Sequence, residues 1–567
     1  MNSISAEFIS AAPEQSPTVK LDRSLHAFVA AFTAGLEPVA LTLAGMDWGL
    51  HLASSPGRQM ELGLDAMRKM QNWLQHAPTS AAALKSTESW GEECEQFWLF
   101  WQSWLQEATK VRGVSNHHQE MNRFFLRQAF DMWSPRNLPW CNPDIWRRAL
   151  ESGGASLWQG KQNWLEDLQK PAYDPQQSDW RPGAEVAVTP GAVVYRNHLI
   201  ELIRYSPQTA QVYAEPLLIV PSWIMKYYIL DLSPQNSMVR YMLQQGHQVY
   251  ILSWNNPDAA DRDLGMDDYL QMGVFAALEV IASIEPGVAV HSAGYCLGGT
   301  LLSIAAAALA RTQQVQDASR MAPLASVTLL AAQTDFSEPG EMGVLIDDSQ
   351  VDMLEDVMSE SGYLSGAQMA GAFQFLNSRD LVWNKRVREY WLGVRDAGND
   401  MMAWNADVTR LPARMHGEYL HQFFLENALA EGKYQVEGAP VSLSDIRLPM
   451  FVVGTVRDQV SPWPSVYKIV RLTRTDVCFL LASGGHNVGI VAAPGNPKSS
   501  YQIHMHLEQD KAVATEAWRS QAESKAGSWW PAWSAWLAAH SSGQKKPRRL
   551  PARRVLQQAP GSYVFKT

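Results

Sequence analysis

Residues 288–312 read VAVHSAGYCLGGTLLSIAAAALART, and they reveal more about the architecture than any other part of the chain. A run of small and β-branched residues leads into Gly294-Tyr295-Cys296-Leu297-Gly298, and an alanine-rich segment of helical character follows. This order of strand, tight turn and helix is typical of the nucleophile elbow, whose pattern is Gly-x-Ser-x-Gly. Here a cysteine replaces the serine. The pattern predicts an α/β-hydrolase fold with Cys296 at the turn.

A free cysteine has a second interpretation, because most such residues are small buried hydrophobes. The glycines on either side of Cys296 oppose this interpretation, since a strained turn and close packing of strand against helix require small neighbours. We therefore interpret Cys296 as a nucleophile.

The composition is typical of a soluble globular protein with large buried interiors, with 46% hydrophobic and 18% charged residues. A chain of 567 residues is too long for one ordinary core, so we expect two or more structural units. The net charge is −10, and aromatic residues are not interleaved with basic clusters. Both features argue against a nucleic-acid partner.

The sequence shows neither a recognisable targeting signal nor a metal-binding motif. The first twenty residues lack the basic start and long apolar run of a secretory signal, and no apolar run approaches the length that spans a bilayer. The four cysteines, Cys94, Cys141, Cys296 and Cys478, show no Cys-x-x-Cys spacing. This pattern predicts neither a disulfide framework nor a zinc site, and it favours the reducing cytoplasm.

Changes in composition and hydrophobic pattern along the chain predict its domain organisation. We expect a flexible tail at 1–20, a mainly helical N-terminal domain at 21–177 and a catalytic domain at 178–567, with a proline-rich linker at 170–183. The later domain contains the strand-like runs AVVYRN, IELIRY, PLLIVPS, QVYILSW, VAVHSA, SVTLLAA, MFVVGT and VCFLLA. They favour a mainly parallel sheet with helices on both faces. The strand-poor region at about 340–440 is expected to be a cap or lid.

Two pieces near the end of the chain have alternative interpretations. Residues 527–540, GSWWPAWSAWLAAH, are rich in tryptophan, and 545–554, KKPRRLPARR, form a short basic run. We expect a packed terminal helix followed by a solvated tail. The alternative is that both pieces dock on an apolar, anionic-lipid-like surface.

An elbow nucleophile needs a histidine base and an orienting acid, which follow it in the chain order nucleophile, acid, histidine. Asp458 comes directly after the strand-like MFVVG, and His486 lies in a Gly-Gly-His loop after VCFLL. Both positions are those expected of groups at the ends of late strands. The sequence therefore predicts Cys296, Asp458 and His486 as a catalytic triad.

Other residues compete for these places. Asp335, in LLAAQTDFS, also follows a strand-like run, and this fold can carry its acid after either of two strands. We favour Asp458 because it is closer to His486 along the chain. His247 and His291 are expected to be structural.

The predicted roles follow from the chemistry of each group. His486 would take the proton of Cys296, and the N-terminus of the helix that begins near Leu297 would favour the resulting thiolate. Asp458 would hold the imidazole tautomer. An oxyanion hole would use the main-chain N–H of Leu297 and one near Ile224, in the loop after PLLIV.

Several stretches of the chain occur together in one known family. They are GYCLGGT, PLLIVPSWIMKYYILDLSPQNSMVRYMLQQGHQVYILSWNNP, WNADVTRLPARMH, GGHNVG, NPDIWRRALESGGASLWQGKQNWLEDL and the terminal APGSYV. From roughly residue 85 to the end, the sequence resembles polyhydroxyalkanoate synthases, and GYCLGG resembles the class I, single-subunit type. These enzymes polymerise (R)-3-hydroxyacyl-CoA into storage polyester.

The resemblance implies short-chain substrates such as 3-hydroxybutyryl-CoA, release of CoA, and no cofactor beyond the CoA thioester as substrate. It implies Cys296 as the chain-carrying nucleophile, His486 as base and Asp458 as its partner. It also places Trp404 near the active-site entrance and Val488 where acyl side-chain fit is adjusted. We further expect a homodimer in the cytoplasm, associated with polyester granules and the growing chain.

The sequence departs from the family pattern at two points. The family usually reads Pro-Pro-Trp-Ile-Asn-Lys where this chain has Pro221-Ser222-Trp223-Ile224-Met225-Lys226, and histidine where this chain has Gln459. Met225 removes a polar group that could contact substrate. Two alternatives remain open: a cysteine-triad thioesterase or esterase, and a weakly active paralogue acting as a granule-bound scaffold.

Overall fold

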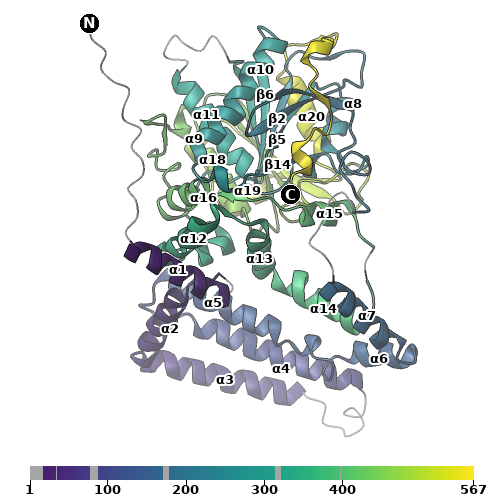
Figure 1. The fold of residues 1–567 in the computed structure, drawn as a ribbon. Helices are drawn as coiled ribbons and strands as arrows, with labels where there is room; N and C mark the ends of the chain where they lie inside the picture. The colour runs from purple at the N-terminus through teal and green to yellow at the C-terminus, as the bar shows by residue number, and fades with distance from the viewer. Residues whose placement is uncertain (1–16, 34, 77–86, 170–177, 313–320, 396) are drawn as a thin grey trace.

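The computed structural model describes residues 17–33, 35–76, 87–169, 178–312, 321–395 and 397–567. A layer of long helices lies below a larger region built on one sheet (Figure 1). Of the expected tail and linker, residues 1–16 and 170–177 lie outside the described residues. The first helix begins at Pro17, so the last four residues of the expected tail are helical.

An eleven-stranded sheet forms the centre of the larger region, in the order β15-β14-β13-β12-β7-β6-β4-β5-β2-β1-β17. The six strands from β13 to β5 are parallel to one another. They are β4 (Leu217–Val220), β5 (Val249–Trp254), β6 (Val290–Tyr295), β7 (Leu324–Leu330), β12 (Met450–Thr455) and β13 (Val477–Ala482). Their residues are almost all buried, as expected of parallel strands covered on both faces.

Antiparallel strands extend the sheet at both edges. They are β1 (Gly191–Arg196), β2 (Ile200–Tyr205), β14 (Ser500–His506), β15 (Glu523–Ala526) and β17 (Gln557–Gln558). All eight strand-like runs of the sequence are strands, which confirms the mainly parallel sheet. The sequence pattern missed β14, β15 and β17, because edge strands with one or both faces in water lack an apolar signature.

Helices cover both faces of the sheet, and alternate strand residues face opposite cores. In β12, Val452 belongs to the core under α10 (Ala276–Ile284) and α11 (Leu297–Thr312), whereas Phe451 belongs to the core under α8 (Met238–Gln244) and α20 (Trp530–Ala539). This is the α/β-hydrolase fold predicted from the elbow. Figure 1 shows α10 and α11 on the opposite side of the strands from α8 and α20.

The tryptophans near the end of the chain are buried in the second core. Trp529, Trp530 and Trp533 are at most 1% exposed, and Trp536 is 9% exposed. Trp529 and Trp530 donate indole hydrogen bonds of 2.9 Å to the carbonyls of Gly489 and Ile490, in the loop after His486. The packed terminal helix is confirmed, and surface docking by these four side chains is wrong, because all four are buried and two of them support the histidine loop from within.

The basic run does not form a free tail. Its first residues pair as β16 (Gln544–Lys545) with β3 (Val212–Tyr213), and the chain returns to the sheet at β17. The segment between these two anchors therefore lies along the edge of the sheet. Most of its residues are exposed, so it is solvated as expected, but it is held at both ends instead of forming a free tail.

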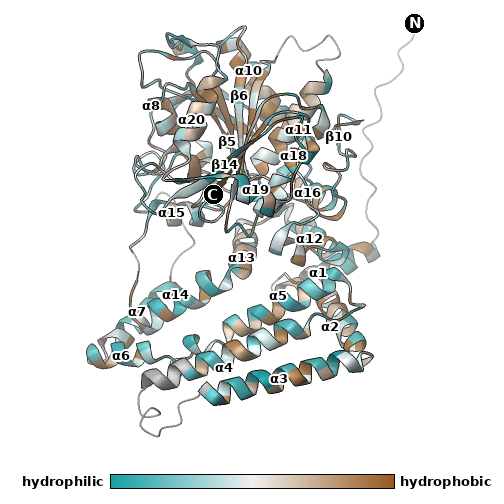
Figure 2. Cartoon of the chain, turned by 180° about the vertical axis from the view of Figure 1, so that it is seen from behind, coloured by the Kyte–Doolittle hydropathy of each residue, from teal (hydrophilic) through white to brown (hydrophobic). Residues whose placement is uncertain are grey.

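The N-terminal region is helical, as expected. Its helices are α1 (Pro17–Phe32), α2 (Pro38–Ala53), α3 (Pro56–His76), α4 (Thr87–Ala108), α5 (Asn116–Met132), α6 (Pro143–Glu151) and α7 (Ala155–Gln169). In the described residues, no helix is both long and apolar enough to cross a bilayer. Helices α3 and α4 lie side by side at the base of the molecule, and their ribbons mix apolar and polar residues (Figure 2).

The strand-poor region at about 340–440 connects these helices to the sheet. It contains α12 (Asp348–Ser361), α13 (Gly366–Leu376), α14 (Asn384–Arg386), α15 (Asp400–Ala406) and α16 (Ala413–Tyr419). Arg127 of α5 donates to Glu341 at 2.6 Å, and Arg395 lies 2.9 Å from Asp167 of α7. The insertion thus receives the N-terminal helices on one side. Its action as a lid stays a prediction.

Candidate active site

Cys296 lies in the turn between β6 and α11 with a strained backbone. Its φ is 52°, in the left-handed region that is costly for any residue with a side chain. Its main-chain nitrogen donates to the carbonyl of Leu330 on β7 at 2.9 Å, which holds the strained turn against the sheet. The side chain is half-buried. Strain of this kind is typical of a nucleophile elbow.

The elbow glycines are required by close approach of backbone to backbone. A Cβ on Gly298 would lie 2.1 Å from the carbonyl oxygen of Val220 at the end of β4. A Cβ on Gly294 would lie 2.3 Å from the Cα of Gly299. No side chain fits at either place, so the helix can begin directly against the sheet only with glycine there.

Asp458 is held rigidly at the end of β12. One carboxylate oxygen, Oδ1, accepts main-chain hydrogen bonds from Val460 and Ser461 at 2.9 and 2.8 Å. The other oxygen, Oδ2, accepts from Thr455 Oγ1 at 3.0 Å and lies 2.8 Å from Nδ1 of His486. The carboxylate therefore has a fixed direction, and it orients the imidazole.

His486 links the carboxylate to the cysteine. Burial alone would lower the pKa of His486, but the charges of Asp458 and Cys296, with a hydrogen bond to each, raise the pKa well above its ordinary value. Because Nδ1 faces Asp458, Nε2 is the nitrogen left for the sulfur. The ring also lies 5.6 Å from that of Tyr295, whose hydroxyl donates to Asn487 Oδ1 at 2.5 Å. The structure thus brings together all three residues of the predicted triad.

The competing residues lie elsewhere. Asp335 accepts hydrogen bonds from Ser337 and Asn427 and lies 3.6 Å from Nζ of Lys468. His291 and His247 are buried, which lowers the pKa of each to about 4. They contact serine hydroxyls, as structural histidines do.

The predicted oxyanion donors come from two different elements, the start of α11 and the loop after β4. Leu297 begins α11 directly after Cys296 and is buried. The main-chain nitrogen of Ile224 donates to Ser222 Oγ at 3.3 Å, a long hydrogen bond that a substrate oxygen can replace. Trp254 Nε1 donates to the carbonyl of Pro221 at 2.9 Å and fixes the start of this loop.

Trp404 is 4% exposed, and its indole N–H donates to the main-chain carbonyl of Lys226 at 2.7 Å. The ammonium of Lys226 donates to the carbonyl of Tyr563 at 3.3 Å and to that of Lys566. Burial lowers the pKa of Lys226 to about 8 and raises the pKa of nearby Asp407 to about 6. Lys226 therefore joins the loop at 221–226 to the insertion and to the end of the chain.

Sequence reasoning named Lys226 only as part of a motif and missed its function as an anchor. One signal was available, because it is a lone cation in the apolar run PSWIMKYYIL. A cation in such a run needs buried acceptors. Thr455 and Asn487 were also missed, and neither carries a distinctive sequence pattern.

Three further residues singled out in the sequence, Val488, Met225 and Gln459, differ in their exposure and contacts. Val488 follows the catalytic loop and is 57% exposed. Met225 is partly buried against the core around α20 and forms an isolated bridge with Val408 of the insertion. Gln459 is exposed beside Asp458. Met225 thus places an apolar side chain where the family usually has a polar one, and its main chain bridges the loop to the insertion. Gln459 is exposed to solvent.

Comparison with known proteins identifies the family. Residues 83–242 match the model described as the poly-beta-hydroxybutyrate polymerase (PhaC) N-terminus, and residues 16–58 match the poly-beta-hydroxybutyrate polymerase N terminal model. A poly(3-hydroxyalkanoate) polymerase of Methylorubrum extorquens is 37% identical over 479 residues, which cover 83% of this chain and 77% of the relative. The chain belongs to the poly(3-hydroxyalkanoate) polymerase family.

Other relatives agree with this assignment. The poly(3-hydroxyalkanoate) polymerase subunit PhaC of Cupriavidus necator is 37% identical over 455 residues, covering 78% of this polymerase and 75% of the relative. Polymerase 2 of Ectopseudomonas oleovorans is 35% identical over 480 residues and is covered to 83%, as is this chain. The protein is therefore an acyltransferase-type enzyme.

Among solved structures, a monoacylglycerol lipase of Paleococcus ferrophilus aligns with 60% of this polymerase and 100% of the lipase, with 13% identity and a TM-score of 0.31. The thioesterase domain from the curacin biosynthetic pathway aligns with 53% of this chain and 94% of its own, with 13% identity and a TM-score of 0.29. Within the described residues of the polymerase, no group of three or more His, Cys, Asp and Glu is placed to hold a metal ion.

Proposed function

We propose that this polymerase loads (R)-3-hydroxyacyl groups from CoA thioesters onto Cys296 and transfers them to a growing polyester, with release of CoA. The observation that carries this proposal is the position of His486, which lies 2.8 Å from Asp458 and close enough to Cys296 for the charge of the cysteine to raise the pKa of the imidazole. A base held between an orienting carboxylate and a strained thiol is the arrangement that activates a nucleophile.

In the loading step, His486 accepts the thiol proton and the sulfur of Cys296 attacks the thioester carbonyl. The carbon–sulfur bond to CoA breaks, and the CoA sulfur leaves with the proton from His486. One thioester replaces another, so the acyl group stays activated. The N–H groups of Leu297 and Ile224 would stabilise the oxyanion of the intermediate.

In the transfer step, the hydroxyl of a second hydroxyacyl unit attacks the acyl group on Cys296. His486 accepts the hydroxyl proton, the bond from carbon to the Cys296 sulfur breaks, and the proton returns to that sulfur. The ester formed is more stable than the thioester consumed, so chain growth runs forward. Closure of the expected lid would reduce competition from water.

Short-chain substrates such as 3-hydroxybutyryl-CoA are part of the proposal, since GYCLGG resembles the class I type. The test is CoA release from a series of acyl lengths, with analysis of the product for polyester. Maximal release with 3-hydroxybutyryl-CoA, accompanied by polymer, is expected. Free hydroxyacid without polymer would establish the thioesterase alternative, and no turnover at all would establish the scaffold.

We also propose that the N-terminal helices contact the polyester granule. Successive helices expose apolar side chains at helical spacing, which form stripes along α1, α2 and α3. The stripes are Leu21, Leu25, Phe28 and Phe32; Val39, Leu43, Met46 and Leu50; and Met60, Leu64, Met67 and Leu74. Three stripes of large apolar side chains exposed to water are unusual in a monomer and typical of an interaction surface.

The localisation test uses Leu43→Ser/Leu50→Ser in cells that form granules. Loss of granule association with retained CoA release is expected. Unchanged association would overturn the assignment to this surface. Sedimentation of the same variant tests whether the stripes instead join two subunits of the expected homodimer, because that outcome changes the mass in the absence of granules.

A further inference from the structure

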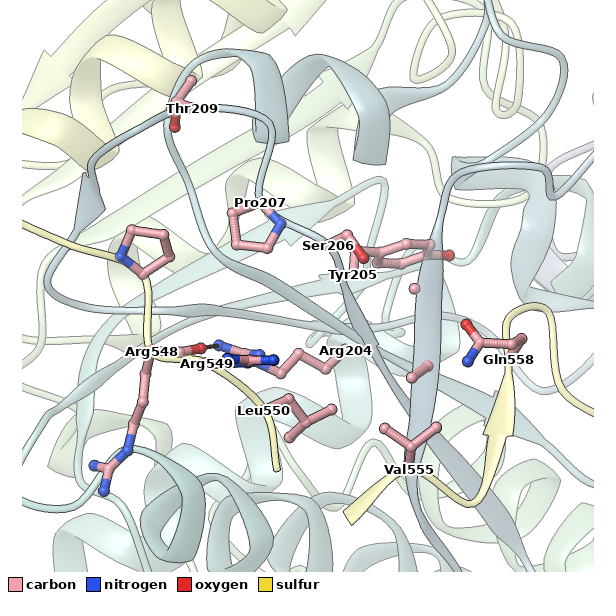
Figure 3. A pocket seen from close by; sticks show the side chains of 13 residues that line it. Arg204, Tyr205, Ser206, Pro207, Thr209, Arg548, Arg549, Leu550, Val555 and Gln558 are labelled. Carbon is pink, nitrogen blue, oxygen red and sulfur yellow. Dashed lines mark hydrogen bonds between the residues drawn. The ribbon is translucent and has the colours of Figure 1, made fainter. Parts of the chain in front are cut away.

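A cavity of about 440 Å³ lies at the edge of the sheet between β1, the end of β2 and the basic segment 547–555 (Figure 3). Arg204 pairs with Tyr250 near the start of β5, whereas Cys296 follows the end of β6, which runs in the same direction as β5. The cavity is therefore at the opposite end of the strands from the nucleophile. The catalytic chemistry described above does not use it.

The charged side chains that line the cavity are all basic. They are Arg204, Arg548 and Arg549, and neither aspartate nor glutamate contributes to the lining. Arg548 and Arg549 are exposed at its rim, and neither guanidinium has a hydrogen-bond or ion-pair partner among the described residues. Figure 3 shows Arg548 and Arg549 on one stretch of chain beside the guanidinium of Arg204, which contacts the main-chain carbonyl of Arg548, whereas the side chain of Arg548 extends away from Arg204.

Arg204 is a buried guanidinium that retains one N–H donor without an acceptor. It is 5% exposed, and its Nη2 donates to the carbonyl of Arg548 at 2.7 Å and to Glu285 at 3.4 Å. Its Nε is buried and has no hydrogen-bond partner. A buried guanidinium N–H without an acceptor is costly, so an acceptor supplied by a ligand would stabilise it.

The local charges do not cancel. Glu285 is buried, and it serves both Arg204 and Lys545, whose ammonium lies 3.2 Å from its Oε2. One carboxylate thus faces two cations, and the two rim arginines add further positive charge. A ligand with about two negative charges would offset most of this excess positive charge.

The walls combine this charge with apolar surface and a rigid frame. Pro207, Leu550 and Val555 line the cavity beside the arginines. The basic segment is anchored before the cavity by β16 and after it by β17. A cavity of this size with apolar walls and a few convergent polar groups accommodates a small organic molecule.

We propose that this cavity binds a small organic phosphate, with the phosphate on Arg204, Arg548 and Arg549 and a compact apolar body against Pro207, Leu550 and Val555. The planar guanidinium fork matches the oxygens of a phosphate, and three such groups suit a dianion better than a single carboxylate. The proposal is independent of the acyl-transfer mechanism.

Equilibrium dialysis of the full chain against AMP, inorganic phosphate and citrate tests the proposal. AMP is expected to bind in the millimolar range or tighter, and more tightly than the other two. Equal binding of inorganic phosphate would overturn the apolar part of the site, and preference for citrate would overturn the choice of phosphate. No binding of AMP would overturn the proposal.

Variants locate the site. Arg548→Glu/Arg549→Glu is expected to lower the affinity for AMP at least about tenfold. The control is the exposed pair Lys498→Glu/Lys511→Glu, which makes the same change of net charge and should leave the affinity for AMP unchanged. Arg204→Lys keeps the charge beside Glu285 but removes the free Nε–H, and it should weaken the binding of AMP. Equal loss in the control pair would overturn the location.

Vesicle sedimentation tests whether an anionic lipid, instead of a small soluble phosphate, occupies the cavity. Vesicles of phosphatidylcholine with and without phosphatidylglycerol are mixed with the wild-type chain and sedimented. Co-sedimentation that depends on the anionic lipid and on Arg548 and Arg549, without binding of AMP, would show that the segment docks on lipid and would overturn the proposal of a small ligand.

Discussion

The imidazole Nδ1 of His486 lies 2.8 Å from Oδ2 of Asp458, at the end of the neighbouring strand β12. Main-chain and hydroxyl donors around Asp458 leave its carboxylate little freedom, so this contact fixes both the tautomer and the direction of the ring. The catalytic proposal depends on this contact more than on any other.

Replacing Asp458 by asparagine should keep the shape of the site but remove the charge that orients the ring. We expect kcat for CoA release to fall by about 10²–10⁴-fold, with a much smaller change in KM. Asp335→Asn is the matched control, because that carboxylate also follows a strand yet contacts Lys468 instead of His486. A similar loss in both variants would contradict the assignment.

The raised pKa of His486 also predicts a pH dependence of stability. Because the folded pKa exceeds the unfolded value of about 6.5, the contribution of His486 is fully present below that value and is lost as pH rises through the folded pKa. Urea unfolding of the wild type and Asp458→Asn from pH 6 upward should therefore converge as pH rises. A constant difference would contradict the coupling.

Lys226 should produce the opposite pH dependence. Its folded pKa is lowered to about 8 from 10.5, so in this range the unfolded chain binds a proton that the folded chain lacks. The free energy of unfolding should rise with pH from about 8 to about 10.5 in the wild type, relative to Lys226→Met. Parallel pH profiles for the two proteins would show that the lysine is not buried as described.

The strained backbone of Cys296 predicts that the residue required for activity lowers the stability of the protein. Cys296→Gly should abolish CoA release and raise the free energy of unfolding by roughly 1 kcal/mol, because glycine adopts a positive φ without strain. Cys296→Ser keeps the strain and should not stabilise the protein. Chemical denaturation of the three proteins measures this difference, and equal stability would show that the turn relaxes.

Glycine 298 tests the close contact between helix and sheet. Gly298→Ala would place a methyl group 2.1 Å from the carbonyl oxygen of Val220, so α11 must shift and the protein should lose about 2 kcal/mol or more of stability. Gly371→Ala is the control, since its Cβ would meet nothing within 4 Å on helix α13. That variant should be neutral or slightly stabilising. Comparable melting temperatures for the two variants would contradict the packing.

Local patterns were sufficient for the elbow and for eight of the eleven strands of the sheet, and they named the three residues that the structure brings together. Each depends on neighbours along the chain: small residues at a tight turn, continuous apolar runs in a buried sheet, and polar residues directly after strands. Asp458 could be preferred over Asp335 from sequence, but only the paired strands β12 and β13 place Asp458 against His486.

The sequence by itself determined the fold class and the position of the cysteine at the elbow, because both depend on short-range patterns. Tertiary structure decided what depends on distant partners. It turned Trp529 and Trp530 inward against the His486 loop, and it tied Lys226 to Trp404, Tyr563 and Lys566. It also laid the basic run along β1 and β2 beside Arg204. Amphipathic side chains suit either surface or core, and only the packing of segments far apart in the sequence decides between them.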